Sequence, residues 1–351
     1  MQRRAFIHHA LLASTVGLFP GCGRGGVRAE VLRALVEQVV VPNTAAIAEN
    51  SRRLNGEIAH LAAEPTVTTL RAARDQWRRS LLSWKRADVF RNGPIMDTNS
   101  LLRAMFWPVR TGAIEALVQS TQVIDEPSID AMGVDRRGLF ALEYLLYFGA
   151  ADDQIAAGFS GPAGERRARL ARSLAVNVSL YADKAARSLG NGQAYADKFA
   201  DGGQDSLNQL VGHLVYAVEH VSASRLARIS NLTKSGLLRP TVVEGGSSRM
   251  SQQVALTYLR ATEELYLGVG RGLSELVNAV SVSADDGLRA AFSQAIAAVS
   301  NLGVPLEEAA QRDPAALDAA AATVKKLERA LRTELASTLG VTLTFSSVDG
   351  D

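Results

Sequence analysis

Apolar residues recur at intervals of three and four along almost the whole chain from Val27 onward. This spacing places them on one face of an α-helix, whereas a half-buried β-strand alternates at every second residue. Aromatic residues make up only 6% of the chain, and a composition rich in alanine and leucine suits packed helices. We therefore predict helices near residues 27–41, 42–63, 66–90, 114–122, 138–148, 164–189, 204–231, 250–279, 284–301 and 314–339.

This number of helices favours an all-α fold built from two packed helical-bundle domains. Residues 28–190 would form the N-terminal half and residues 191–351 the C-terminal half, with a Gly-Asn-Gly break between them. Only residues 341–345 alternate in the manner of an extended segment. We expect them to form a short extended C-terminal tail that packs across helices.

The first 22 residues have the features of an export signal. Arg3 and Arg4 precede an apolar stretch over residues 10–19, which is too short to cross a bilayer, since that takes about 20 residues. Charge, apolar stretch and small residues in this order predict a signal peptide rather than a buried helix. The sequence Arg3-Arg4-Ala5-Phe6-Ile7 also resembles the twin-arginine export core, which would imply export in the folded state.

Cys22 is the only cysteine, so no intrachain disulfide forms. Together with residues 18–21 it resembles a bacterial lipobox, in which the cysteine is lipidated and becomes the mature N-terminus. The alternative is an ordinary signal peptide with an incidental cysteine. If the lipobox is used, the protein is exported, anchored by lipid at Cys22 on the periplasmic side of a bacterial membrane, and residues 23–27 form a flexible tether.

The charge pattern argues against a nucleic-acid partner. The formal net charge of +2 is spread along the chain. There is no run of lysine and arginine with interleaved aromatic residues, which is typical of nucleic-acid-binding proteins. The small basic cluster at residues 165–169 is interpreted as the solvated start of a helix.

A single carboxylate, Glu143, lies inside the apolar stretch of residues 138–149. Burying a carboxylate is costly unless it is paired or bound to a metal. Glu143 is therefore either a ligand carboxylate in a binding site, or a structural group that pairs with Arg136 or Arg137 or accepts hydrogen bonds from the 247–251 loop. We favour the structural role.

Five separated segments resemble imelysin-like proteins. They are residues 84–88 with Gly93-Pro94, Trp107-Pro108, residues 138–146, residues 243–251, and residues 339–345 with the terminal Asp-Gly-Asp. The family consists of exported bacterial proteins, often lipoproteins, which are linked to iron regulation and have been classed as metallopeptidases. The resemblance implies an all-helical, two-domain fold with the signature segment 138–146 near the domain junction.

The family signature Gly-x-His-x-x-Glu is altered in this chain. Gly138 and Glu143 are present, but Phe140 stands at the histidine position. A histidine and a glutamate three residues apart lie on one helix face, where they suit zinc, iron or copper. Because Phe140 offers no lone pair, Glu143 remains as a weak candidate ligand for a divalent metal.

Other histidines do not obviously replace the missing one. Beyond the predicted signal peptide, the sequence contains His60, His213 and His220. His213 and His220 are seven residues apart on roughly one helix face and would point toward one site, but we favour surface or hydrogen-bonded core histidines. No His-Glu-x-x-His sequence is present, which excludes that class of zinc site.

The polar segment of residues 244–249 would bind an anion or close a cleft, although such loops more often cap helices. Ser247 or Ser248 is the expected N-cap of the next helix. We expect all three tryptophans to lie in the core. The candidate binding residues are Gly138, Phe140, Glu143, Glu244, Ser247 and Ser251.

The sequence thus favours a non-catalytic binding or accessory lipoprotein of the cell envelope that takes part in metal, above all iron, or haem acquisition. Its partners would be the membrane, through the lipid anchor, and a metal, haem or an envelope protein. A metal-dependent peptidase that recruits ligands from elsewhere is one alternative. A structural protein-interaction module is another.

Overall fold

The computed structural model describes residues 24–343 except 148 and 150, so the predicted signal peptide and Cys22 lie outside the described residues. Within the described part of the chain, the regular structure is helical, and the only β-type pairing is an isolated bridge between Val269 and Arg271. The prediction of an all-α fold is confirmed. Residues 341–343 carry no helix, and the rest of the predicted tail is outside the described range.

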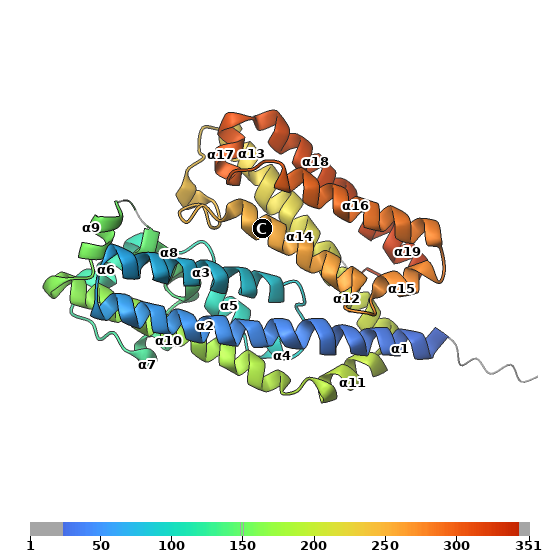
Figure 1. The fold of residues 1–351 in the computed structure, drawn as a ribbon, viewed down its shortest axis with the longest axis horizontal. Coiled ribbons are helices and arrows are strands. Elements are labelled where there is room, and N and C mark those ends of the chain that lie inside the picture. The colour runs from blue at the N-terminus through green and yellow to red at the C-terminus, as the bar shows by residue number, and fades with distance from the viewer. Residues whose placement is uncertain (1–23, 148, 150, 344–351) are drawn as a thin grey trace, which may run out of the picture.

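The first long helix passes through two predicted segments without a break (Figure 1). Helix α1 (Arg24–Leu35) continues through the π-helical segment η1 (Val36–Val40) into α2 (Val41–Ala63). Pro42 lies in this continuous helix, just after the π-helical segment, and does not end it. Gly26–Ala63 is long and apolar enough to cross a membrane by length and composition alone, but over half of its apolar window is buried inside the molecule. It is therefore well explained as a core helix.

Helices α2, α3 (Val67–Ala87) and α10 (Gly161–Leu189) form the body of the N-terminal group. Thr66 starts α3 with a reciprocal capping box to Thr69, as the predicted helix start requires. The region from residue 94 to 137 contains more helix than predicted. It holds α4 (Pro94–Asp97), α5 (Ser100–Met105), α6 (Thr111–Gln119) and α7 (Glu126–Ala131). Helix α6 corresponds to the helix predicted near residues 114–122, and the other three are too short for their periodicity to be recognised.

The signature segment forms α8 (Gly138–Tyr147), followed by α9 (Asp152–Ala157). Helix α8 packs on α3, α5 and α10. Gly138 has φ +78°, and a Cβ there would lie 2.5 Å from the carbonyl oxygen of Ala104. Only glycine fits this position without displacing α5, since other residues are strained at positive φ and lack the space.

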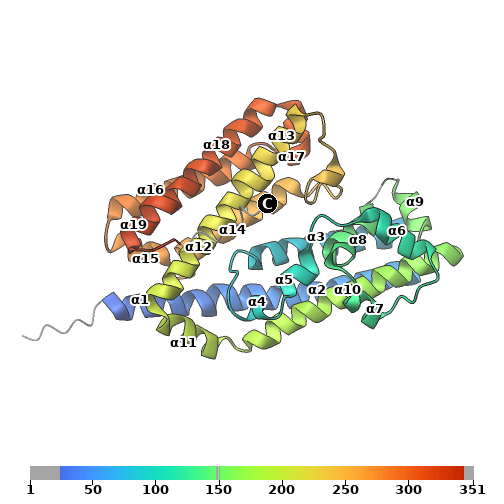
Figure 2. The same ribbon diagram turned by 180° about the vertical axis from the view of Figure 1, so that it is seen from behind.

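The second group of helices lies across the first (Figures 1 and 2). It consists of α12 (Gly203–Val221), the π-helical η3 (Ser222–Ala227), α13 (Arg228–Lys234), α14 (Ser251–Leu267), α15 (Leu273–Asn278), α16 (Val282–Ser300), α17 (Leu306–Arg312), α18 (Pro314–Ala330), η5 (Leu331–Leu335) and α19 (Ala336–Leu339). Helix α17 was not predicted. The predicted helix 250–279 is interrupted at residues 268–272, where Gly268 has φ +69°.

The two groups meet where α14 packs against α3 and where α12 reaches α1. Helix α11 (Gln193–Asp201), just after the predicted boundary at residue 190, packs against α1. The exact division into two domains stays a prediction. The junction matters because it brings the end of α3 and the segment after α5 to face α12, η3 and α14.

Candidate functional site

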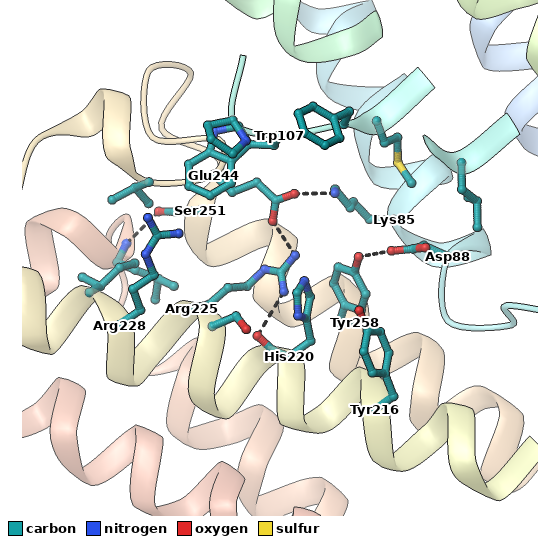
Figure 3. Close-up of a pocket in the computed structure, with 18 of the residues that line it drawn as sticks. Lys85, Asp88, Trp107, Tyr216, His220, Arg225, Arg228, Glu244, Ser251 and Tyr258 are labelled. Atoms are coloured by element: carbon teal, nitrogen blue, oxygen red, sulfur yellow. Dashed lines mark hydrogen bonds and ion pairs between the residues drawn. The ribbon is translucent and has the colours of Figure 1, made fainter. Parts of the chain in front are cut away.

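A cavity of about 480 Å³ lies at this junction (Figure 3). Its walls come from the end of α3, from α5 and the segment after it, from α12 to α13, from residues 242–244, and from α14. The volume is in the range of small-molecule sites. The sequence segments that build it are far apart in the chain, so helix packing alone assembles it.

Three charged side chains form the floor of the cavity. The Glu244 carboxylate accepts a hydrogen bond from Lys85 Nζ at 2.5 Å and another from Arg225. Lys85 is 3% exposed and Arg225 5% exposed. Burial raises the pKa of Glu244, but the two cations outweigh burial and lower it to about 2. Glu244 is therefore ionised, and it is the counter-charge that lets Lys85 and Arg225 be buried.

A second carboxylate at the cavity, Asp88, is also engaged. Tyr258 donates its hydroxyl to Asp88, and Arg91 approaches the same carboxylate at 3.2 Å. Burial and the nearby Asp88 charge raise the pKa of Tyr258 well above its usual range. The Tyr258 hydroxyl thus stays protonated and serves as a donor.

Aromatic groups line the side of the cavity. His220 stacks on Tyr216 with ring centres 5.5 Å apart. Burial, with Arg225 nearby, lowers the pKa of His220 to about 4, so the ring is neutral at physiological pH. The Arg228 guanidinium lies 5.1 Å from the Trp107 ring centre, a cation–π distance. Trp77 and Trp84 are fully buried in the core, whereas Trp107 is only partly buried against it and forms part of the cavity wall.

Arg225 and Arg228 are presented by an irregular stretch of helix. Arg225 belongs to the π-helical segment η3, and Arg228 begins α13 directly after it. Short π-helical insertions occur often at functional sites because they rotate the following side chains relative to an α-helix. The only pointer to these two residues in the sequence was the spacing of two arginines three residues apart. Nothing in the sequence distinguished them from solvated surface arginines.

The signature helix lies behind the cavity floor. Phe140 is buried at 1% exposure, and Lys85 Nζ lies 5.2 Å from its ring centre. Glu143 is 6% exposed and accepts two hydrogen bonds through Oε1, from the Ser248 backbone N–H at 3.0 Å and the Ser248 hydroxyl at 2.6 Å. The carboxyl thus ties α8 to the loop before α14, as the structural interpretation with the 247–251 loop expects.

Glu143 differs electrostatically from Glu244. Burial raises the pKa of Glu143 to about 7, the Ser248 hydrogen bonds oppose this rise, and the negative charges of Glu244 and Glu307 add to it. The alternative partners are engaged elsewhere, since Arg137 donates to Asp130 and to backbone carbonyls. Glu143 is consequently a substantially protonated acid near neutral pH.

The serines of the loop have roles other than capping. Helix α14 begins at Ser251 with Met250 before it, and no side chain caps it, so the prediction of Ser247 or Ser248 as N-cap is wrong. Ser248 is diverted to Glu143. Ser251 touches the cavity, donates to Glu307 at 2.5 Å and accepts from the Leu306 N–H. Ser247 lies in a separate hollow with Arg249 and Glu308.

The two central histidines do not share a site. His220 lines the cavity, whereas His213 packs edge-on against Phe90, and burial lowers the pKa of His213 to about 4. His60 is exposed, with 75% of its side chain accessible. The structure therefore separates the three histidines that the sequence offered as replacements for the one absent at Phe140.

The residues at the signature helix do not fit a bound divalent metal. Phe140 supplies no ligand, Oε1 of Glu143 already accepts two hydrogen bonds from Ser248, and Lys85, a cation, lies against the Phe140 ring. Among residues 24–343, apart from the undescribed positions, no three histidine, cysteine, aspartate or glutamate side chains are grouped so as to hold a metal ion.

Comparison with known proteins identifies relatives of the whole helical region. The family model Peptidase_M75, described as Imelysin, matches residues 40–336. An iron-regulated protein A precursor from Parabacteroides distasonis ATCC 8503 has a similar fold, with a TM-score of 0.75, 14% identity, and coverage of 90% of this chain and 96% of that chain. An imelysin-like protein from Psychrobacter arcticum 273-4 aligns with a TM-score of 0.74 and 19% identity over 92% of this chain and 98% of that chain. No curated protein sequence matches the chain.

Proposed function

Because the chain belongs to the imelysin family, we propose that it is a non-catalytic binding protein of the cell envelope whose ligand site is the junction cavity. The observation that carries the proposal is Phe140 at the histidine position of the signature helix, beside a Glu143 whose Oε1 accepts two hydrogen bonds from Ser248. A metallopeptidase needs a metal to activate water. The signature helix does not supply the histidine–glutamate ligand pair for that chemistry.

The cavity gives the protein a place to bind without reacting. It combines aromatic surface from Trp107 and Tyr216 with fixed polar groups, a combination typical of ligand sites. The lowered pKa values of two of its groups, about 2 for Glu244 and about 4 for His220, leave Glu244 ionised and His220 neutral near neutral pH. This arrangement suits recognition better than proton transfer, which needs a group with a pKa near the working pH.

The proposed link to iron or haem acquisition rests on a structural neighbour and on the N-terminal sequence. One structural neighbour is named an iron-regulated protein A precursor, and the N-terminal sequence around Arg3, Arg4 and Cys22 has the pattern of an exported lipoprotein. On this proposal the chain is anchored by lipid at Cys22 and presents its cavity on the periplasmic side. A Cys22→Ser variant should lose labelling by a radioactive fatty acid and leave the membrane fraction.

The catalytic question is tested by metal content and peptide cleavage of the purified full-length chain. We expect no stoichiometric zinc or iron and no hydrolysis of a peptide library. Stoichiometric metal and peptide cleavage, both lost in Glu143→Gln, would establish a peptidase and overturn the proposal.

A Phe140→His variant sharpens this test. It places an imidazole three residues before Glu143 on the same helix face, so zinc affinity at pH 8, where Glu143 is ionised, should rise at least tenfold. Phe292→His, which changes another fully buried phenylalanine in α16, is the matched control and should not gain zinc affinity. An equal gain in both variants would show that the signature helix holds no remnant site.

A further inference from the structure

The cavity carries an excess of positive charge. The described residues that line it include four basic side chains, Lys85, Arg91, Arg225 and Arg228, against the carboxylates of Asp88 and Glu244. His220 adds no charge at neutral pH. A concave site lined by one sign of charge attracts ligands of the opposite sign.

Both carboxylates are already used by the protein. Glu244 lies between Lys85 and Arg225, as Figure 3 shows, and Asp88 is held by Tyr258 and Arg91. Neither is free to receive a metal cation, and a bare cation would also meet the neighbouring basic groups. The floor therefore disfavours a naked metal ion.

Arg228 is the basic group left without an anion. It makes no hydrogen bond or ion pair with any residue in the described part of the chain, and its one recorded partner is the Trp107 ring. It is exposed, whereas Arg225 one turn earlier is buried. An arginine fixed against an aromatic ring, with its planar donors directed to solvent in a cavity, is suited to a carboxylate or phosphate.

A further donor lies deeper. The Nε of Arg225 is buried and has no hydrogen-bond partner among the described residues, although the other nitrogens of this guanidinium bind Glu244 and the His220 carbonyl. Buried donors are rarely left unpaired in proteins. Together, the two arginines give the wall formed by η3 and α13 a surplus of donors over acceptors.

We propose that the junction cavity binds a small organic anion rich in carboxylates, with Arg228 as the anchoring cation, and that any metal enters it only as the complex of such an anion. This inference rests on the proposed binding function and names its ligand class. The aromatic rings of Trp107 and Tyr216 would contact the organic part of the ligand. The protein contributes cations and aromatic surface, while the ligand itself contributes the atoms that hold the metal.

The experiment is a calorimetric titration of the full-length chain with citrate, ferric citrate, haem, inorganic phosphate and bare zinc or ferrous ion. We expect a carboxylate ligand (citrate, ferric citrate or haem) to bind and the bare ions not to bind. Arg228→Gln should weaken that binding at least tenfold and reduce its dependence on salt. Arg329→Gln, which removes an exposed helical arginine outside the cavity, should leave the affinity unchanged.

The outcomes separate the ligand class from the function. Binding of phosphate alone, or of bare metal ions without any of the anions, would overturn the carboxylate proposal while leaving a non-catalytic binding protein intact. Carboxylate binding that is equally weakened in Arg228→Gln and Arg329→Gln would overturn the assignment to Arg228. If no carboxylate ligand binds at millimolar concentration, the proposal that the cavity takes a carboxylate anion is overturned. Failure of the proposed function appears separately, as peptide cleavage by the unmodified chain.

Discussion

Two glutamates, Glu244 in the cavity floor and Glu143 behind it, are both buried, but the protein compensates the cost of burying their carboxyl groups in opposite ways. Glu244 is placed between two cations, Lys85 and Arg225, and its pKa is lowered to about 2. Glu143 has hydrogen-bond donors from Ser248 but no cation, and burial raises its pKa to about 7. Glu244 remains charged because its partners are charged, and Glu143 keeps its proton up to about pH 7 because its partners are not.

The different partners of Glu143 and Glu244 show which part of the site is available to a ligand. Glu143 serves as an internal strap between α8 and the loop before α14, and its ionisation works against folding. Glu244 keeps two cations buried at the cavity, so its charge supports the site. The signature carboxylate of this chain is thus bonded to the protein's own loop, and the cavity presents basic and aromatic groups.

The largest expected effect comes from removing the charge of Glu244. Glu244→Gln leaves Lys85 and Arg225 buried without a counter-charge, which should lower the free energy of unfolding by about 3–5 kcal/mol. Urea denaturation at pH 7 measures it. Glu308→Gln, in a surface ion pair with Arg249, is the control and should cost no more than about 1 kcal/mol. An equal loss of unfolding free energy in the two variants would contradict the distinction between the buried charges of the cavity floor and a surface ion pair.

The second effect is a pH dependence that belongs to Glu143. Its folded pKa of about 7 exceeds the usual 4.5, so the folded state holds the extra proton and the stability it contributes is lost as pH rises from 5 to 8. Relative to Glu143→Gln, which keeps an acceptor for Ser248, the unmodified chain should lose about 2–3 kcal/mol over this range. The lowered pKa values of His213 and His220 act in the opposite direction below pH 6.5, but they are common to both proteins. A pH-independent difference would contradict the assignment.

The smallest expected effect concerns the hydrogen bonds between Glu143 and Ser248. Ser248→Ala removes the hydroxyl donor but keeps the backbone donor to Glu143, so the cost should be about 1–2 kcal/mol. Because the lost bond had stabilised the charged carboxylate, the cost should be larger at pH 8 than at pH 5. Ser337→Ala, at an exposed serine that bonds only a backbone carbonyl, should cost less and show no such trend. Thermal unfolding at both pH values separates the two.

The sequence predicted the helices well where they are long and periodic, as at α3, which was predicted over residues 66–90 and spans Val67–Ala87. It missed α17 and the short helices α4, α5 and α7, because helices of seven residues or fewer give too little periodicity, whereas α6 was predicted near residues 114–122. It identified Glu143 and Glu244 as candidates, and the loop as a partner for Glu143. It could not predict the contact of Lys85 with Glu244 or the place of Trp107, because these depend on how two distant helical groups are packed together.

Glu143, the acid of the signature helix, is a structural group whose raised pKa keeps its proton up to about pH 7. Infrared difference spectroscopy of the unmodified chain against Glu143→Gln, recorded from pH 5 to 9, tests it directly. We expect a protonated-acid carbonyl band that disappears with a midpoint near pH 7 and does not change when one equivalent of zinc is added. A carboxylate that is ionised throughout this range, or a band that shifts with zinc, would contradict the account.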